Sequence, residues 1–343
     1  MSERVVSVIV PCRNERRYIE RFCAGVLSQQ VPSGWRLQLV IADGDSDDGT
    51  RELLQQLNAS DSRITWIANP ARIVSPGLNA ALKVAAGEII VRMDVHTDYA
   101  PDYIAQCLAL HAETGADNVG GPWHAVPDAD AGAMQHAVAA AFQSRWVAGG
   151  ASSRRLDFNG WVDTVYLGSW PRQTFERFGG FDEQLVRNQD DEHNLRIVKG
   201  GGKVWQSSRI RSTYRPRATL SQVFRQYLQY GYWKPFVMKK HGQAASLRHL
   251  VPSLFVAALA VLAVPALFGV VWPLLGLLAL YGAAVLAMTL AVWQQQASPV
   301  PVVLRIPAVI AAYHLGYGIG SLAGWWDVLR GATGRARFAT LTR

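Results

Sequence analysis

Carboxylates gather in a short stretch that runs from Asp43 to Thr50. The stretch reads Asp-Gly-Asp-Ser-Asp-Asp-Gly-Thr and follows 37–42, an apolar run that predicts a buried strand. In α/β proteins, ligands bind at the carboxyl ends of such strands, so Asp43 and Asp45 are candidates for ligand binding. A solvated turn whose Asp side chains cap the next helix is the alternative. A calcium loop of the EF-hand type is excluded, because the Glu of its last position is missing.

A second candidate is the segment Arg92-Met93-Asp94-Val95-His96, which ends another predicted strand at 88–93. In an extended chain, side chains two residues apart point the same way, so Asp94 and His96 are expected to reach one cation. Mn²⁺ accepts imidazole, whereas Mg²⁺ prefers oxygen ligands. Such a cation would neutralise a leaving diphosphate. A surface pair without a metal is the alternative.

A third candidate is the run Gln189-Asp190-Asp191-Glu192, which stands near the start of a predicted helix. Three acidic side chains at this place complement the helix dipole. One of them can instead act as a general base that takes a proton from an acceptor hydroxyl.

Strand and helix patterns alternate over the first third of the chain. Strands are predicted at 5–10, 37–42, 64–68 and 88–93, and helices at 18–28, 50–57, 77–86 and 101–114. This alternation indicates an α/β fold built on a mostly parallel sheet. Further along, a helix is expected at 134–146. An amphipathic helix rich in aromatic and basic residues is expected at 218–241, of the kind that lies in a membrane interface.

Apolar residues concentrate near the carboxyl end of the 343-residue chain. The runs 250–272 and 273–293 each match the thickness of a bilayer core as a helix, about 30 Å. The run 306–326 is expected to be either a third span or a re-entrant or interfacial segment. A third crossing would carry the following arginines outside, against the positive-inside rule. These arginines are Arg330, Arg335, Arg337 and Arg343.

The sequence therefore predicts four regions: a catalytic domain at 1–217, an interfacial region at 218–249, a membrane segment at 250–326 and a basic tail at 327–343. The net charge is +8, and basic residues cluster just before the first apolar run, which fits anionic lipid headgroups. Nucleic acid is not expected as a partner, because no binding motif is recognisable. Three cysteines without metal-type spacing and the lack of a signal-peptide pattern favour a cytoplasmic catalytic domain on a bacterial inner membrane.

Five motifs in this order resemble the family 2 glycosyltransferases, and within them most closely the ExoA-like succinoglycan-type glucosyltransferases. The motifs are Ser7-Val8-Ile9-Val10-Pro11 with Asn14-Glu15, the loop at Asp43, Asp94-Val95-His96, Gly179-Gly180-Phe181-Asp182-Glu183 and Gln189-Asp190-Asp191-Glu192. The resemblance covers about 1–235 well and implies a GT-A fold, a nucleotide-sugar donor, a divalent cation (Mn²⁺ or Mg²⁺) and inversion at the anomeric carbon.

The resemblance also assigns roles to residues. Asp190 would be the general base, and Asp94 would bind ribose and metal. His96 stands where the family has the second Asp of its DxD motif, which leaves the identity of the metal open. Binding of the donor nucleotide would fall to Pro11, Glu15, Asp43, Asp45, Arg72 and Asp94. Trp161 and Asp163 would border the acceptor, and Arg225, Gln226 and Tyr230 would help to close the site.

The expected reaction adds one sugar, glucose by the resemblance, from a UDP-sugar to a hydroxyl of a polyprenyl-diphosphate-linked glycan in exopolysaccharide synthesis. The Gln-x-x-Arg-Trp motif of processive synthases is replaced by Gln226-Tyr227-Leu228-Gln229-Tyr230. One alternative enzyme resembles the dolichol-phosphate mannosyltransferases, in which a lipid phosphate accepts the sugar without a general base. A second alternative is a membrane-tethered binding module without catalysis. A Rossmann dehydrogenase is excluded by the lack of Gly-x-Gly-x-x-Gly.

Overall fold

The computed structural model describes residues 3–147, 149–242, 246–334 and 337–338. The chain forms two compact units, one of Met1–His124 with Arg155–Tyr214 and one of Ala125–Arg154 with Arg215–Arg343. The first unit ends at Tyr214, close to the expected boundary at 217. It differs from the expected catalytic domain in lacking residues 125–154, which fold with the carboxyl-terminal helices. Arg335 and Arg343 of the expected basic tail lie outside the described residues.

The first unit is built on a mixed sheet that comprises eight strands among the described residues, in the order β3-β2-β1-β4-β9-β6-β10-β8. A smaller sheet has the order β5-β11-β7. The strands are β1 (Arg4–Cys12), β2 (Trp35–Asp43), β3 (Ile64–Ala68), β4 (Ile89–Arg92), β5 (Thr97–Tyr99), β6 (Asn118–Gly121), β7 (His124–Ala125), β8 (Gly160–Trp161), β9 (Tyr166–Pro171), β10 (Val204–Gln206) and β11 (Ser212–Tyr214).

The four strands at one side of the larger sheet are parallel, as the alternation of strands and helices predicts. β1 pairs in parallel with β2 and β4, and β2 with β3, whereas β9 is antiparallel to both β4 and β6. Pro11 does not end the first strand as expected, because the parallel pairing continues to Cys12, which lies opposite Asp43. The carboxyl ends of β1 and β2 therefore meet where the acidic loop begins.

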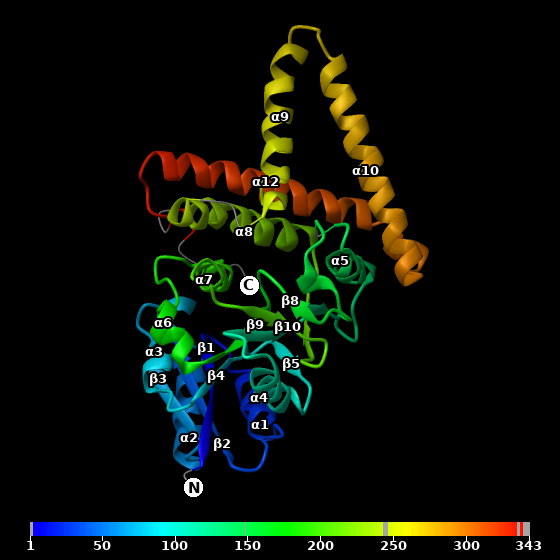
Figure 1. Cartoon of the computed structure of the whole chain (residues 1–343). Helices are drawn as coiled ribbons and strands as arrows, with labels where there is room; N and C mark the ends of the chain where they lie inside the picture. Colours follow the sequence, from blue (N-terminus) through cyan, green and yellow to red (C-terminus); the bar gives the residue numbers. More distant parts are fainter. Residues whose placement is uncertain (1–2, 148, 243–245, 335–336, 339–343) are drawn as a thin grey trace. The chain divides into compact units, whose positions relative to one another are not determined.

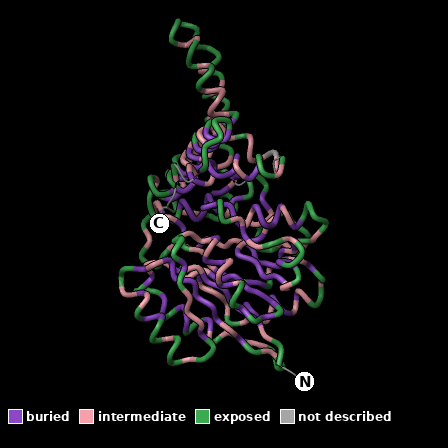
Figure 2. The backbone as a smooth tube through the Cα atoms, turned by 90° about the vertical axis from the view of Figure 1, so that its left-hand side faces the viewer, coloured by how far each residue is buried: buried purple, intermediate pink, exposed green. Residues whose placement is uncertain are grey.

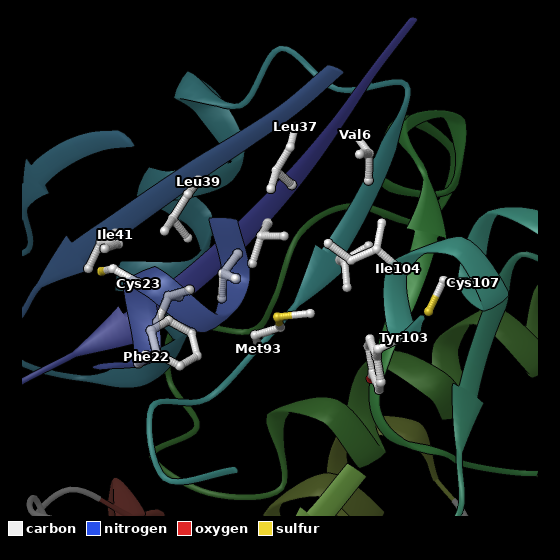
Figure 3. Packing of buried hydrophobic residues seen from close by; sticks show 14 of the residues in the cluster. Val6, Phe22, Cys23, Leu37, Leu39, Ile41, Met93, Tyr103, Ile104 and Cys107 are labelled. Carbon is white, nitrogen blue, oxygen red and sulfur yellow. The ribbon is translucent and has the colours of Figure 1, made fainter. Parts of the chain in front are cut away.

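Helices cover both faces of the sheet, because alternate residues of its central strands are apolar on both sides. The helices are α1 (Ile19–Leu27), α2 (Thr50–Ser60), α3 (Val74–Val84), α4 (Tyr103–Thr114), α6 (Arg172–Phe178) and α7 (Gln189–Lys199). Val6 and Leu39 pack on one face with Phe22 of α1 and Ile104 of α4 (Figure 3). Ile9 packs on the other face, with residues of α3, α6 and α7.

The second unit is helical. It contains α5 (Ala133–Gln143), η1 (Ser152–Arg154), α8 (Leu220–His241), η2 (Leu247–His249), α9 (Val251–Ala266), α10 (Trp272–Gln296), α11 (Val300–Val303) and α12 (Ile306–Leu329). α5 joins this unit because it packs on the last helices: Nε2 of Gln296 donates to the carbonyl oxygen of Ala140 at 3.0 Å, and the Tyr313 hydroxyl donates to that of Val138 at 3.3 Å.

Two stretches of this unit are long and apolar enough to cross a membrane: Trp272–Gln296 and Val300–Leu329. α9 has 16 residues and ends at Ala266, earlier than the expected 272. Figure 1 shows α9 and α10 as a helical hairpin, and Figure 2 shows mostly exposed residues along it. The expected spans at 250–272 and 273–293 thus correspond to this hairpin, and the run 306–326 corresponds to α12.

Candidate active site

The loops that follow β1 and β2 are joined by hydrogen bonds. The backbone N–H of Asn14 donates to the Ser46 hydroxyl at 2.8 Å, and its side-chain amide donates to the Asp47 carboxylate at 2.8 Å. One residue further, the N–H of Glu15 donates to the Thr50 hydroxyl at 2.7 Å. These contacts fix the acidic loop against the end of the central strand.

Two carboxylates of the acidic loop serve this architecture. Asp47 bonds Asn14, and Asp48 accepts from the backbone N–H groups of Arg16 and Thr50, at 3.1 Å each. Thr50 is the first residue of α2, so Asp48 satisfies a backbone donor that the helix itself leaves unpaired. The turn-and-cap interpretation therefore applies to Asp47 and Asp48.

The other two carboxylates of the loop face arginines. Asp43 is fully buried and accepts hydrogen bonds from the Ser46 hydroxyl at 2.5 Å and from Nε of Arg51 at 3.3 Å. Asp45 is partly exposed and pairs with both Arg51 and Arg72. Hydrogen bonds from Arg51 and Arg72 lower the pKa of Asp45. The cluster thus holds two guanidinium groups and two carboxylates at a strand end, and guanidinium groups are the donors that bind a diphosphate through charge-assisted hydrogen bonds.

Asp94 lies just beyond β4, in a turn. Its backbone N–H donates to the Tyr99 hydroxyl at 2.7 Å, and its carbonyl oxygen accepts from the N–H of Thr97 at 3.2 Å. Its carboxylate accepts two hydrogen bonds from Arg92, at 3.2 Å each. An extended chain is expected here from the sequence. The structure turns it at residues 95 and 96.

His96 contacts a different carboxylate as a result of this turn. Its Nε2 lies 2.8 Å from Oε2 of Glu15, and its ring packs edge-on against Tyr18 at 4.8 Å. The structure thus pairs Asp94 with Arg92 and His96 with Glu15. The expectation that Asp94 and His96 reach one cation through an extended chain does not hold in this conformation, and the role of His96 as a metal ligand stays a prediction.

The three adjacent acids of α7 have three different partners. Nη1 of Arg92 lies 3.8 Å from the Asp190 carboxylate, and the hydroxyl of Thr164 lies 3.3 Å from that of Asp191. Glu192 is fully buried and pairs with Arg196 at 2.6 Å. Asp190 therefore shares Arg92 with Asp94.

Arg92 lies between the carboxylates of Asp94 and Asp190. Its side chain is 7% exposed, and its Nη1 makes no hydrogen bond within the described residues. Burial lowers the pKa of Arg92, but Asp94 and Asp190 outweigh this effect and hold it above its ordinary value. Removal from water raises the pKa of Asp190, while Arg92 lowers it. Sequence reasoning assigned no role to Arg92, because a single arginine inside a strand pattern carries no distinctive signal.

The residues expected to border the acceptor belong to the segment that includes β8 and ends before β9. Trp161 is 50% exposed and packs edge-on against Trp205, with the ring centroids 4.7 Å apart. Asp163 is exposed, and the next residue, Thr164, accepts from Asn194 of α7 at 3.0 Å. The Lys203 ammonium lies 5.4 Å from the centroid of the Trp161 ring, and the half-exposed ring offers an apolar surface of the kind that packs on a sugar ring. Arg225, Gln226 and Tyr230 lie on α8 in the second unit, so their part in closing the site stays a prediction.

No group of three or more His, Cys, Asp or Glu side chains suited to a metal ion occurs in the part of the chain that the structure describes. A divalent cation commonly binds one or two carboxylates together with substrate phosphates. The carboxylate of Asp94 is 35% exposed, so its oxygens fit a cation held jointly with a diphosphate.

Comparisons with known proteins agree on the kind of domain. The family model described as "Glycosyl transferase family 2" matches residues 7–168. The succinoglycan biosynthesis protein ExoA of Rhizobium meliloti is 30% identical, over 94% of each chain. A Methanococcus voltae dolichyl N-acetyl-α-D-glucosaminyl phosphate 3-β-D-2,3-diacetamido-2,3-dideoxy-β-D-glucuronosyltransferase is 24% identical, over 68% of this chain and 74% of its own.

Among solved structures, the mannosyltransferase PcManGT of Pyrobaculum calidifontis, in complex with GDP-Man and Mn²⁺, superposes with a TM-score of 0.57. It is 20% identical, and the match covers 94% of this chain and 87% of that chain. At this identity the likeness concerns the fold. The GT-A-like α/β fold with a mostly parallel sheet, predicted from the sequence, is thereby confirmed.

Proposed function

Since the chain belongs to the family 2 glycosyltransferases, we propose that it moves one sugar from a nucleotide-diphosphate donor to a hydroxyl of a membrane-associated glycan, with inversion at the anomeric carbon. The observation that carries this proposal is the position of Asp190. Its carboxylate lies 3.8 Å from Arg92, which also holds Asp94, so a base and a donor-side carboxylate adjoin one buried cation.

The donor would bind at the ends of β1, β2 and β4. Asp45 would accept hydrogen bonds from the ribose hydroxyls, because it is partly exposed, whereas Asp43 is buried and Asp47 and Asp48 bond to the backbone and side chains that hold the loop. Arg51 and Arg72 would face the anionic part of the nucleotide. Asp43 would act through Arg51, since its own carboxylate is buried. Pro11 and Glu15 would lie beside the nucleotide.

The acceptor hydroxyl would lose its proton to Asp190 as its oxygen attacks the anomeric carbon from the face opposite the leaving diphosphate. A positioned general base contributes about 10²- to 10⁴-fold to the rate. The pKa of Asp190 is raised by removal from water, and Arg92 opposes this rise and so favours the ionised carboxylate; Arg92 also orients Asp94 through two hydrogen bonds. When a divalent cation is bound, it neutralises the developing charge on the diphosphate, and Asp94 is the residue that would hold it.

The acceptor we propose is a glycan on a polyprenyl diphosphate in the bacterial inner membrane, with the catalytic unit in the cytoplasm. Two considerations support it. The ExoA relative is named for succinoglycan biosynthesis, and the Methanococcus relative is named for a dolichyl-linked sugar acceptor. The second unit also carries two stretches long and apolar enough to cross a membrane. The proposed donor is a UDP-sugar, with glucose as the sugar that the family resemblance suggests.

The test measures sugar transfer by membranes that contain the protein, with polyprenyl-linked acceptors, a panel of nucleotide sugars, and Mn²⁺, Mg²⁺ or chelator. Asp190→Asn should lose at least about 10²-fold in turnover while it still binds donor. Asp191→Asn is the matched control, because the neighbouring carboxylate contacts Thr164 instead of Arg92. Turnover of Asp190→Asn like that of the parent protein would remove the base and favour transfer to a lipid phosphate.

A further inference from the structure

A row of glycines joins α12 to α8. A β-carbon at Gly316 would lie 2.8 Å from the carbonyl oxygen of Phe224, and one at Gly320 would overlap that of Leu228. One turn later, a β-carbon at Gly324 would overlap the carbonyl oxygen of Tyr232. Helix backbones come this close only where small residues face them. Residues further along α12 contact residues further along α8, so the two helices run parallel. Figure 1 shows them side by side.

Side chains tie the two helices at both ends of this row. The rings of Tyr227 and Tyr313 stack with their centroids 4.0 Å apart. Near the end of α12, the Tyr232 hydroxyl donates to Asp327 at 2.7 Å, and Arg337 donates to the same carboxylate at 3.0 Å. The α8–α12 pair is therefore one packed layer along most of its length.

α8 cannot lie within the hydrocarbon core of a bilayer. It carries Arg225, Lys234, Lys239 and Lys240, and charged side chains at the bilayer centre are costly. The start of α8 follows within a few residues of β11, the last strand of the catalytic unit. Since α12 contacts α8 through the whole glycine row, α12 cannot cross the bilayer without taking these charges with it.

The start of α9 fixes the depth of α12 independently. A β-carbon at Gly318, near the middle of α12, would overlap the carbonyl oxygen of Pro252 in the first turn of α9. Arg248 and His249 come just before that turn. If α12 crossed the membrane, its middle would lie at the bilayer centre and would hold these two basic residues there. The contact instead places the middle of α12 where α9 enters the bilayer.

The face of α12 that turns away from α8 is apolar. Ile319, Trp326 and Leu329 are 43%, 54% and 80% exposed, and Arg305 and Arg330 stand at the two ends of the helix. An apolar surface flanked by basic side chains fits contact with a bilayer and its anionic headgroups, and the contacts of α12 with α8 and α9 decide its depth. The occupant of this face is thus a bilayer with its headgroups.

We infer that α12 lies along the bilayer surface on the side of the catalytic unit, packed on α8, and that only the α9–α10 hairpin enters the membrane among the described helices. This inference rests on the membrane association in the proposed function. It places Arg330 and Arg337 on the side of the catalytic unit, in agreement with the positive-inside rule.

The test labels single cysteines with a membrane-impermeant maleimide. Thr333→Cys reports the end of α12, and Ser60→Cys in the catalytic unit is the matched control; both positions are exposed, and the three native cysteines are buried. Both variants should resist labelling in intact spheroplasts and react in inside-out vesicles. Labelling of Thr333→Cys in spheroplasts that protect Ser60→Cys would overturn the inference.

Two further readings separate this inference from the proposed function. Extraction of the chain from membranes by alkaline carbonate would overturn the membrane placement, whatever the enzyme transfers. Sugar transfer is measured on the same two variants. If α12 crosses the membrane but sugar transfer persists, the inferred topology is wrong and the proposed function is unaffected. If the labelling is as expected but no donor supports transfer, the topology holds and the proposed function is wrong.

Discussion

Replacement of Arg92 by Met tests whether one buried cation serves both carboxylates of the site. Met keeps the length and apolar stem of the side chain and removes its charge and all its hydrogen-bond donors. Arg92→Lys keeps the charge as a control, but an ammonium is a point charge and does not reproduce the paired hydrogen bonds to Asp94.

The size of the effect follows from the 3.8 Å between Nη1 of Arg92 and the Asp190 carboxylate. Two unit charges about 4 Å apart attract by about 1 kcal/mol in water and about 4 kcal/mol near a protein surface. Asp190 is 34% exposed, so solvent screens the pair and the lower part of this range applies. A loss of about 1 to 2 kcal/mol corresponds to a five- to thirtyfold lower rate where Asp190 must stay ionised.

The pH dependence gives the sign of this effect. Removal from water raises the pKa of Asp190, and Arg92 opposes that rise. Without the guanidinium the pKa rises further, so the base is protonated over a wider acidic range. Arg92→Met should therefore lose rate on the acidic side and recover at higher pH, and Arg92→Lys should recover part of the loss.

The assay is kcat against pH at saturating donor, with donor binding measured separately by titration of UDP. Arg92→Met should also weaken donor binding, because Asp94 loses both of its hydrogen bonds to Arg92. An acidic limb that coincides with that of the parent protein in Arg92→Met would refute the reasoning, even if the rate fell.

Three other changes test other parts of the molecule. Arg51→Met should raise the donor KM about tenfold, because charge-assisted hydrogen bonds are lost. Arg63→Met is the control and should leave the donor KM unchanged, because its ion pair with Asp61 lies away from the site. Equal donor KM values for the two variants would exclude Arg51 from the donor site. Trp161→Ala should raise the acceptor KM about three- to tenfold, because an aromatic contact contributes about 1 kcal/mol to binding. Trp161→Phe should restore the acceptor KM, and a change in the donor KM alone would contradict an acceptor role. Gly320→Leu should lower the free energy of unfolding in detergent by about 1 to 3 kcal/mol or more, because its side chain has no room against Leu228. Gly276→Leu, where the structure has open space, should change it little. Similar melting temperatures for the two variants would refute the close packing of α8 and α12.

The sequence predicted the central strands and the acidic residues beside them for one physical reason. Buried parallel strands are continuous apolar runs, and their carboxyl ends meet at one edge of the sheet. Asp43 and Asp94 follow such runs, so their placement followed from local patterns. The fold and the position of these carboxylates at one edge of the sheet were therefore predictable from the chain alone, and their part in donor binding stays a prediction.

The contacts between side chains were not predictable in the same way. The turn at 95 and 96, which sends His96 to Glu15, depends on a hydrogen bond between the Tyr99 hydroxyl and the Asp94 backbone. The grouping of α5 with the last helices depends on contacts such as Ala140 with Gln296, 156 residues apart. Periodicity reports which face of an element is buried, but not which distant element covers it.

The three acids at the start of α7 show why two interpretations of one motif need not exclude each other. All three stand in the first turn, where any negative charge complements the helix dipole. Each residue of a helix is rotated by about 100° from the one before it, since 3.6 residues complete a turn. The side chains of Asp190, Asp191 and Glu192 must therefore diverge, and the structure directs them to Arg92, Thr164 and Arg196 respectively. The helix dipole favours acidic residues throughout this turn, whereas Asp190, which faces Arg92, shares that cation with Asp94. That shared cation is the physical reason to assign the proton transfer to Asp190 and a structural part to its neighbours.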